Sequence, residues 1–107
     1  MKVTNGVGTI SRLYIEDVPG LDPVTVILEN FAAGVGRITI ICWGEVWTSF
    51  WGGMNGNSVE KFFLRCCGEY LADNLSAGNK RTKAKTAYLL RIIEAVKAGL
   101  VVESENE

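Results

Sequence analysis

The sequence contains no histidine among its 107 residues, and this absence removes several kinds of active site. Histidine is the commonest general base near neutral pH and a frequent metal ligand. Without it, neither a Ser-His-Asp nor a Cys-His catalytic arrangement can form within one chain, and zinc sites that contain histidine are excluded. The absence favours a protein that is not an enzyme.

Cysteine is scarce, with Cys42 alone and Cys66 next to Cys67. An odd number with two neighbours is not typical of a secreted disulfide framework, so we expect reduced thiols in a cytoplasm. Successive residues on a helix point about 100° apart, which disfavours one metal ion bound by both thiols. Redox motifs place two residues between their cysteines. We expect small buried side chains on an apolar stripe, with a redox or metal site as the alternative, and we predict no cofactor and no metal.

Long apolar runs are also missing. The longest, residues 38–43, is interrupted by Thr39 and falls well short of the roughly 18 residues that indicate a membrane span. The N-terminal residues MKVTNGVGTI lack the apolar segment of a secretory signal. We therefore expect no membrane association and a location in the cytoplasm.

Neither sign of charge dominates the chain, whose formal net charge is −1. The distribution is uneven, however: about −2 over residues 1–56, about +4 over residues 57–99 and about −3 over the remaining tail. The whole molecule has no strong attraction for nucleic acid or anionic membranes, and only the second half could attract an anionic partner.

The first half of the sequence has the pattern of strands, over about residues 8–52. Val24, Val26 and Leu28 alternate with Thr25, Ile27 and Glu29, as expected when successive side chains point to opposite faces. Residues 37–43 are rich in β-branched side chains, and Gly44-Glu45 suggests a tight reversal into residues 46–51. These features predict an antiparallel meander of three or four strands.

The second half has the pattern of two amphipathic helices, over about residues 58–75 and 82–99. Asn57 with Glu60 resembles a capping box, residues 76–79 form a stop, and Gly99 is a natural terminator. We expect an α+β fold in which both helices pack on one face of the sheet, followed by a frayed acidic tail at residues 101–107. With 48% apolar and 21% charged residues, the chain fits one folded domain over residues 1–107.

Three tryptophans, Trp43, Trp47 and Trp51, fall within nine residues. If the chain turns at Gly44-Glu45, Trp47 and Trp51 share one face of the returning strand and Phe50 lies on the other. A sheet covered by helices on one side cannot bury both sets. The tryptophans are therefore either core residues or an aromatic surface for a partner or for a second copy of the chain.

Four basic residues, Lys80, Arg81, Lys83 and Lys85, stand at the expected start of the second helix. Basic residues at a helix N-terminus oppose the macrodipole, so local stability does not explain them. They form either an ordinary solvated surface or a docking patch for phosphates or for an acidic protein.

Several segments resemble small accessory proteins of enterobacterial tailed phages and prophages, over about residues 3–76. The segments are GTISRL at 8–13, VPGLDPVTV at 18–26, GRITI at 36–40, WTSFWGGM at 47–54 and, more weakly, EYLADNLS at 69–76. The resemblance implies an origin in a phage gene and no specific mechanism. Many such products bind and block host factors, including defence systems such as CRISPR effectors.

The sequence thus favours a non-catalytic phage protein that binds a host or phage protein, as an inhibitor or counter-defence factor. Trp43, Trp47 and Trp51 would anchor the partner, and Lys80, Arg81, Lys83 and Lys85 would steer it or form a second contact. The alternative is a small nucleic-acid-binding protein that places the same basic residues on phosphates. A homodimer formed through an aromatic sheet face or through the second helix is a further possibility.

Overall fold

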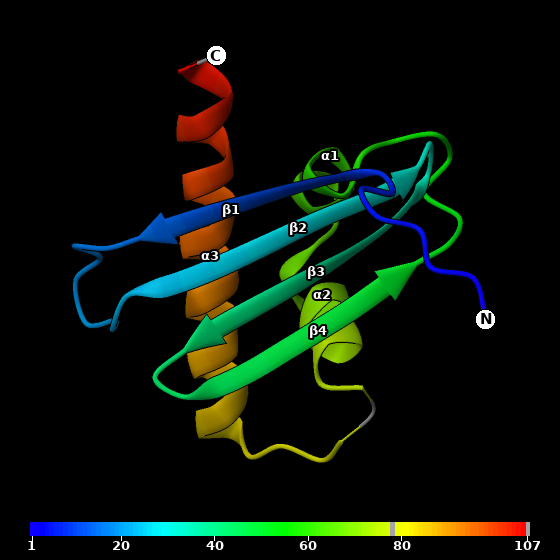
Figure 1. Cartoon of the computed structure of the whole chain (residues 1–107). Helices are drawn as coiled ribbons and strands as arrows, with labels where there is room; N and C mark the ends of the chain where they lie inside the picture. The colour runs from blue at the N-terminus through cyan, green and yellow to red at the C-terminus, as the bar shows by residue number, and fades with distance from the viewer. Residues whose placement is uncertain (78, 107) are drawn as a thin grey trace.

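A computed structural model describes residues 1–77 and 79–106, in which four strands are followed by three helices (Figure 1). The strands are β1 (Thr9–Ile15), β2 (Val24–Ala32), β3 (Val35–Cys42) and β4 (Glu45–Trp51), and the helices are α1 (Val59–Arg65), α2 (Gly68–Leu75) and α3 (Lys83–Glu105). The strands form one antiparallel sheet in the order β1-β2-β3-β4. The predicted α+β class and meander are confirmed.

All three helices lie on one face of the sheet, and α3 crosses behind the strands (Figure 1). Alternation along the two central strands determines which side chains meet the helices. The side chains of β2 and β3 that point toward the helices are almost completely buried: Val24, Val26, Leu28, Ile38, Ile40 and Cys42. Facing them are the buried helical residues Phe63, Leu71, Ile92, Ile93 and Val96. The predicted division of β2 into two faces is confirmed, and burial of the apolar face drives the two layers together.

The helix predicted over residues 58–75 is in fact two helices, separated by Cys66 and Cys67 in extended conformation. The break changes the direction of the chain, so both helices contact α3, but α1 lies against β2 and β3 whereas α2 lies against β4. The freed carbonyl oxygen of Cys66 accepts a hydrogen bond from Lys97 Nζ at 2.6 Å. Cys66 is half-buried and Cys67 is exposed, so the expectation that both thiols are buried was wrong.

The predicted ends of the helices also need correction. Ser58, not Asn57, caps α1, because its Oγ accepts a hydrogen bond from the backbone of Lys61. Helix α3 continues through Gly99 to Glu105, so the predicted frayed tail is helical there, and its last turns extend beyond the β1 edge of the sheet (Figure 1). Gly99 serves packing rather than termination, since a Cβ there would lie 2.6 Å from Ile15 Cδ1. Gly78 of the predicted stop and Glu107 of the tail lie outside the described residues.

Asn30 links the end of β2 to the start of α1. Its Oδ1 accepts a hydrogen bond from the backbone of Val59 at 2.8 Å, and its Nδ2 donates to Glu60 Oε1 at 2.8 Å. The first N–H groups of a helix have no partner within the helix, so Asn30 supplies a cap from a distant strand. It thereby positions α1 against the sheet.

Replacing this residue, Asn30→Ala, is expected to lower the free energy of unfolding by about 1–2 kcal/mol, because a partly buried helix N–H loses its acceptor. Urea denaturation followed by circular dichroism measures the change. The matched control is Asn74→Ala, which removes an amide that donates only to Tyr70 O within α2. It should change stability by less than about 0.5 kcal/mol. Equal losses in the two variants would contradict the linking role of Asn30.

Candidate functional site

The structure places the three tryptophans in three different environments. Trp43 occupies the two-residue turn between β3 and β4, where it has a φ of 51° and is 78% exposed. Trp47 and Trp51 share one face of β4, as predicted, and that face is turned toward the helices, where Trp47 is half-buried and Trp51 is only 7% exposed. The ring of Trp51 packs against that of Phe62, with 5.1 Å between centroids. The three residues do not form one surface, and only Trp43 and Trp47 are within reach of a partner.

The side of the sheet that faces away from the helices is not covered by any described element (Figure 1). We call it the open sheet face. It carries the outward side chains of all four strands: Ile10, Arg12, Tyr14, Thr25, Ile27, Glu29, Phe31, Arg37, Thr39, Ile41, Val46, Thr48 and Phe50. Four large apolar side chains on it are more than half exposed: Ile10, Tyr14, Val46 and Phe50. The sequence reasoning assigned no role to these residues, although the alternation along β4 separated Phe50 from Trp47 and Trp51.

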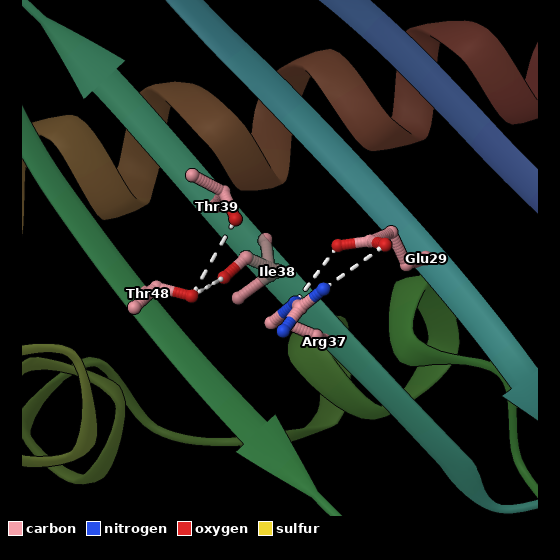
Figure 2. Close-up of polar contacts among 5 residues, drawn as sticks. All are labelled: Glu29, Arg37, Ile38, Thr39 and Thr48. Atoms are coloured by element: carbon pink, nitrogen blue, oxygen red, sulfur yellow. Dashed lines mark hydrogen bonds and ion pairs between the residues drawn. The ribbon is translucent and has the colours of Figure 1, made fainter. Parts of the chain in front are cut away.

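Polar contacts order the middle of the open sheet face (Figure 2). Arg37 donates two hydrogen bonds to the Glu29 carboxylate, at 2.8 and 3.1 Å. These bonds and the opposite charge of Glu29 raise the pKa of Arg37 above its usual value. Thr48 Oγ1 lies 3.0 Å from the carbonyl oxygen of Ile38, to which it donates, and 3.4 Å from Thr39 Oγ1. The polar side chains are thus paired within the sheet.

Aromatic side chains extend this ordered region toward one end of the face. The guanidinium of Arg37 lies 5.4 Å from the centre of the Phe31 ring, a cation–π distance. The Phe31 and Phe50 rings are 6.2 Å apart. A binding surface composed of such pre-ordered side chains loses little conformational entropy when it is covered.

The basic residues also differ in their surroundings. Arg81 is held in place, because its Nη2 pairs with Asp73 at 2.8 Å and its Nε donates to Thr86 Oγ1 at 2.9 Å. Lys80, Lys83 and Lys85 are exposed. None of these three lysines forms an ion pair with a described residue. The chain therefore has a guanidinium held by hydrogen bonds and, near it in the sequence, exposed ammonium groups without an ion pair to a described residue.

A hollow of about 360 Å³ lies between the start of β4, the end of α2 and the start of α3, and both basic and aromatic side chains line it. We call it the basic cleft and define it by Glu45, Trp47, Lys80, Arg81, Lys85 and Tyr88. Four of the seven predicted partner-binding residues line it: Trp47, Lys80, Arg81 and Lys85. Trp43, Trp51 and Lys83 do not. Tyr88 was not among the predicted site residues, because only the fold brings it against Trp47.

Tyr88 is held inside this cleft. Its ring centre lies 6.2 Å from that of Trp47, and its hydroxyl donates a hydrogen bond to Cys42 Sγ at 3.4 Å. That hydrogen bond, with burial and the nearby charges of Glu45 and Asp22, raises the pKa of Tyr88 to about 12. The phenol is therefore uncharged near neutral pH and does not repel an anion.

The described part of the chain has a Cys66 thiol of low reactivity and no cluster of metal ligands. Burial raises the pKa of the Cys66 thiol, which makes it a weaker nucleophile. Within residues 1–77 and 79–106, no three histidine, cysteine, aspartate or glutamate side chains come together as metal ligands. The same residues include no helix with the length and apolar character needed to cross a membrane.

Comparison with known proteins gives one match. A family model described as a phage family matches residues 1–96. No curated protein and no solved structure matches the chain.

Proposed function

The chain belongs to the phage family whose model covers residues 1–96, and on this premise we propose that it is a non-catalytic accessory protein that binds a host or phage protein through the open sheet face. The setting agrees with the resemblance to phage accessory proteins seen in the sequence. The family description gives no activity, so the proposal rests on the surface of the molecule.

Exposed apolar side chains on the open sheet face carry the proposal. Large apolar patches are rare on the surface of monomeric proteins and mark sites of interaction. Here Tyr14 and Phe50 are 62% and 58% exposed, and they stand on the two edge strands, β1 and β4. Aromatic side chains and arginine are enriched at the centre of protein interfaces, and the face offers both.

The charges on the face indicate what kind of partner would fit. Glu29 and Arg37 neutralise each other, whereas Arg12 is exposed on β1 and makes no ion pair with a described residue. The complementary surface is therefore a largely apolar protein patch with one carboxylate placed to reach Arg12. Binding of this kind would act by covering a site on the partner, in the host cytoplasm, which is the inhibitory or counter-defence role expected of such phage proteins.

The test uses the double variant Tyr14→Thr with Phe50→Thr, because the β-branched threonine side chain is well tolerated in strands. Tagged wild-type and variant proteins are incubated with bacterial lysate, and partners are compared by quantitative mass spectrometry. The affinity of the purified partner is then measured by calorimetry. We expect binding at least about tenfold weaker in the variant, since the two lost anchors together contribute more than about 1.4 kcal/mol.

The control is Val101→Thr, which alters an exposed apolar residue on α3 that is not part of the open sheet face. It should leave the affinity unchanged. Full affinity in a folded Tyr14/Phe50 variant would contradict the proposal. A dimer in light scattering that dissociates in the Tyr14/Phe50 variant would also overturn it, because a second copy of the chain would then cover the face.

A further inference from the structure

We propose that the basic cleft binds a nucleotide, with the base against Trp47 and Tyr88 and the phosphate near Lys80, Arg81 and Lys85. The site is separate from the open sheet face, because neither Tyr14 nor Phe50 lines it. The ligand is defined by its chemistry, an aromatic base joined to a phosphate. It can be a free mononucleotide or one unit of a single strand.

The basic cleft has the size and the lining of a site for a small ligand. A hollow of about 360 Å³ lies within the range of roughly 300–1,000 Å³ of small-molecule sites. A single base and its sugar phosphate can enter a hollow of this size. Its lining includes the buried side chains Leu75 and Leu89, which provide an apolar floor.

The rings of Trp47 and Tyr88 form an aromatic wall on which a base can stack. The rings of Trp47 and Tyr88 are tilted by 59° to each other, so they form a corner rather than a closed stack. Trp47 is half-buried, which leaves part of the indole open to the cleft. Bases stack on such aromatic surfaces with little dependence on their identity, because every base has a π-face.

The charged side chains of the basic cleft favour an anionic ligand. The lining has three cations and one carboxylate, that of Glu45. Arg81 is already oriented by Asp73 and Thr86, whereas Lys80 and Lys85 are free to move onto an anion. Lys85 stands in the first turn of α3, where its charge opposes the helix macrodipole, and a bound phosphate would relieve that repulsion.

The position of Glu45 predicts the direction of the ligand. Glu45 begins β4, two residues before Trp47, so negative charge lies at the aromatic end of the cleft. The phosphate is therefore expected at the other end, beside residues 80–85. Inorganic phosphate alone would gain only the cationic contacts and should bind more weakly than a nucleotide.

The experiment titrates ¹⁵N-labelled full-length protein with adenosine monophosphate, with inorganic phosphate and with a short oligothymidylate. Each indole N–H signal is assigned by one of the substitutions Trp43→Phe, Trp47→Phe and Trp51→Phe. We expect the monophosphate to shift the Trp47 signal and to leave the Trp43 signal in place. Its affinity should fall as salt rises, because phosphate contacts release counterions. If only the oligonucleotide binds, the natural ligand is one unit within a single strand. If the mononucleotide binds as well, the natural ligand is a free nucleotide. Either outcome supports the cleft.

A matched pair of variants locates the phosphate. Lys85→Gln should weaken nucleotide binding by about tenfold, whereas Lys83→Gln, in the same basic stretch but outside the cleft, should weaken it by less than about twofold. Three results would overturn the proposal: no shift of the Trp47 signal with either the mononucleotide at millimolar concentration or the oligothymidylate, equal losses in the two lysine variants, or inorganic phosphate that binds as tightly as the nucleic-acid ligand.

Discussion

Trp51→Ala is expected to lower the free energy of unfolding by about 3–5 kcal/mol, whereas Trp43→Ala should change it by less than about 0.5 kcal/mol. Trp51 is 7% exposed and packs on Phe62, so truncation leaves a cavity between β4 and the helices. Trp43 is 78% exposed in a turn, and truncation of its side chain leaves no cavity in the core. Since small domains are stable by only about 5–15 kcal/mol, the first variant would lose a large share of the total.

A third variant, Trp51→Phe, separates packing from polarity at the same position. Trp51 Nε1 is buried and has no hydrogen-bond partner among the described residues. Phenylalanine keeps most of the apolar volume and removes this unsatisfied N–H group. The loss should therefore be well below that of Trp51→Ala, about 1 kcal/mol.

Guanidinium chloride unfolding, followed by far-ultraviolet circular dichroism, measures all three variants. A similar loss for Trp43→Ala and Trp51→Ala would show that the turn residue also packs in the core and would contradict the arrangement. A loss for Trp51→Phe as large as for Trp51→Ala would mean that the indole N–H contributes a favourable contact.

Gly34→Ala is expected to lower the free energy of unfolding by about 2–5 kcal/mol, the second largest effect. Gly34 turns the chain between β2 and β3 with a φ of 74°, a region that residues with a Cβ rarely adopt. An added Cβ would also lie 2.8 Å from the backbone nitrogen of Gly56. In addition, the carbonyl oxygen of Gly34 accepts a hydrogen bond from the backbone nitrogen of Met54 at 2.9 Å. The turn is therefore held against the segment that leads into α1, and neither can shift freely.

Two control variants divide this loss into its causes. Gly44→Ala introduces the strain alone, since Gly44 has a φ of 78° but open space around its Cβ, and should lose about 1–2 kcal/mol. Gly53→Ala introduces neither strain nor a close contact and should be neutral or stabilising by up to about 1 kcal/mol. Thermal and urea unfolding should give the order Gly34, Gly44, Gly53. Equal losses for Gly34 and Gly44 would remove the close contact as a cause.

The strands were largely predictable, because alternation is a local property. Val24, Val26 and Leu28 differ from their neighbours in type, and the period of two follows from the pleat of a strand. The helices were less predictable. Residues 59–75 have a continuous helical period, yet the chain breaks at Cys66-Cys67 because α1 and α2 pack on different strands. The role of Gly99 depends on Ile15, a contact between residues far apart in the sequence.

The candidate site was predictable only in part. Trp47 and Lys80 were both chosen from the sequence, but only the fold places them in one cleft with Tyr88. Trp51 was grouped with Trp43 and Trp47 by its spacing, and the same spacing puts it in the core. The open sheet face went unassigned, because its residues come from four strands and no short segment contains them.

The sequence by itself determined the division into a strand half and a helical half, the faces of the central strands and the absence of histidine-based chemistry. These depend on residue type and on periods of two or about 3.6 residues, which each segment carries within itself. Only the tertiary structure decided which sheet face stays open, where the first helix breaks and which aromatic residue meets the lysines. Those outcomes depend on packing between segments distant in the chain, and the best burial of the whole core, rather than any local pattern, selects among them.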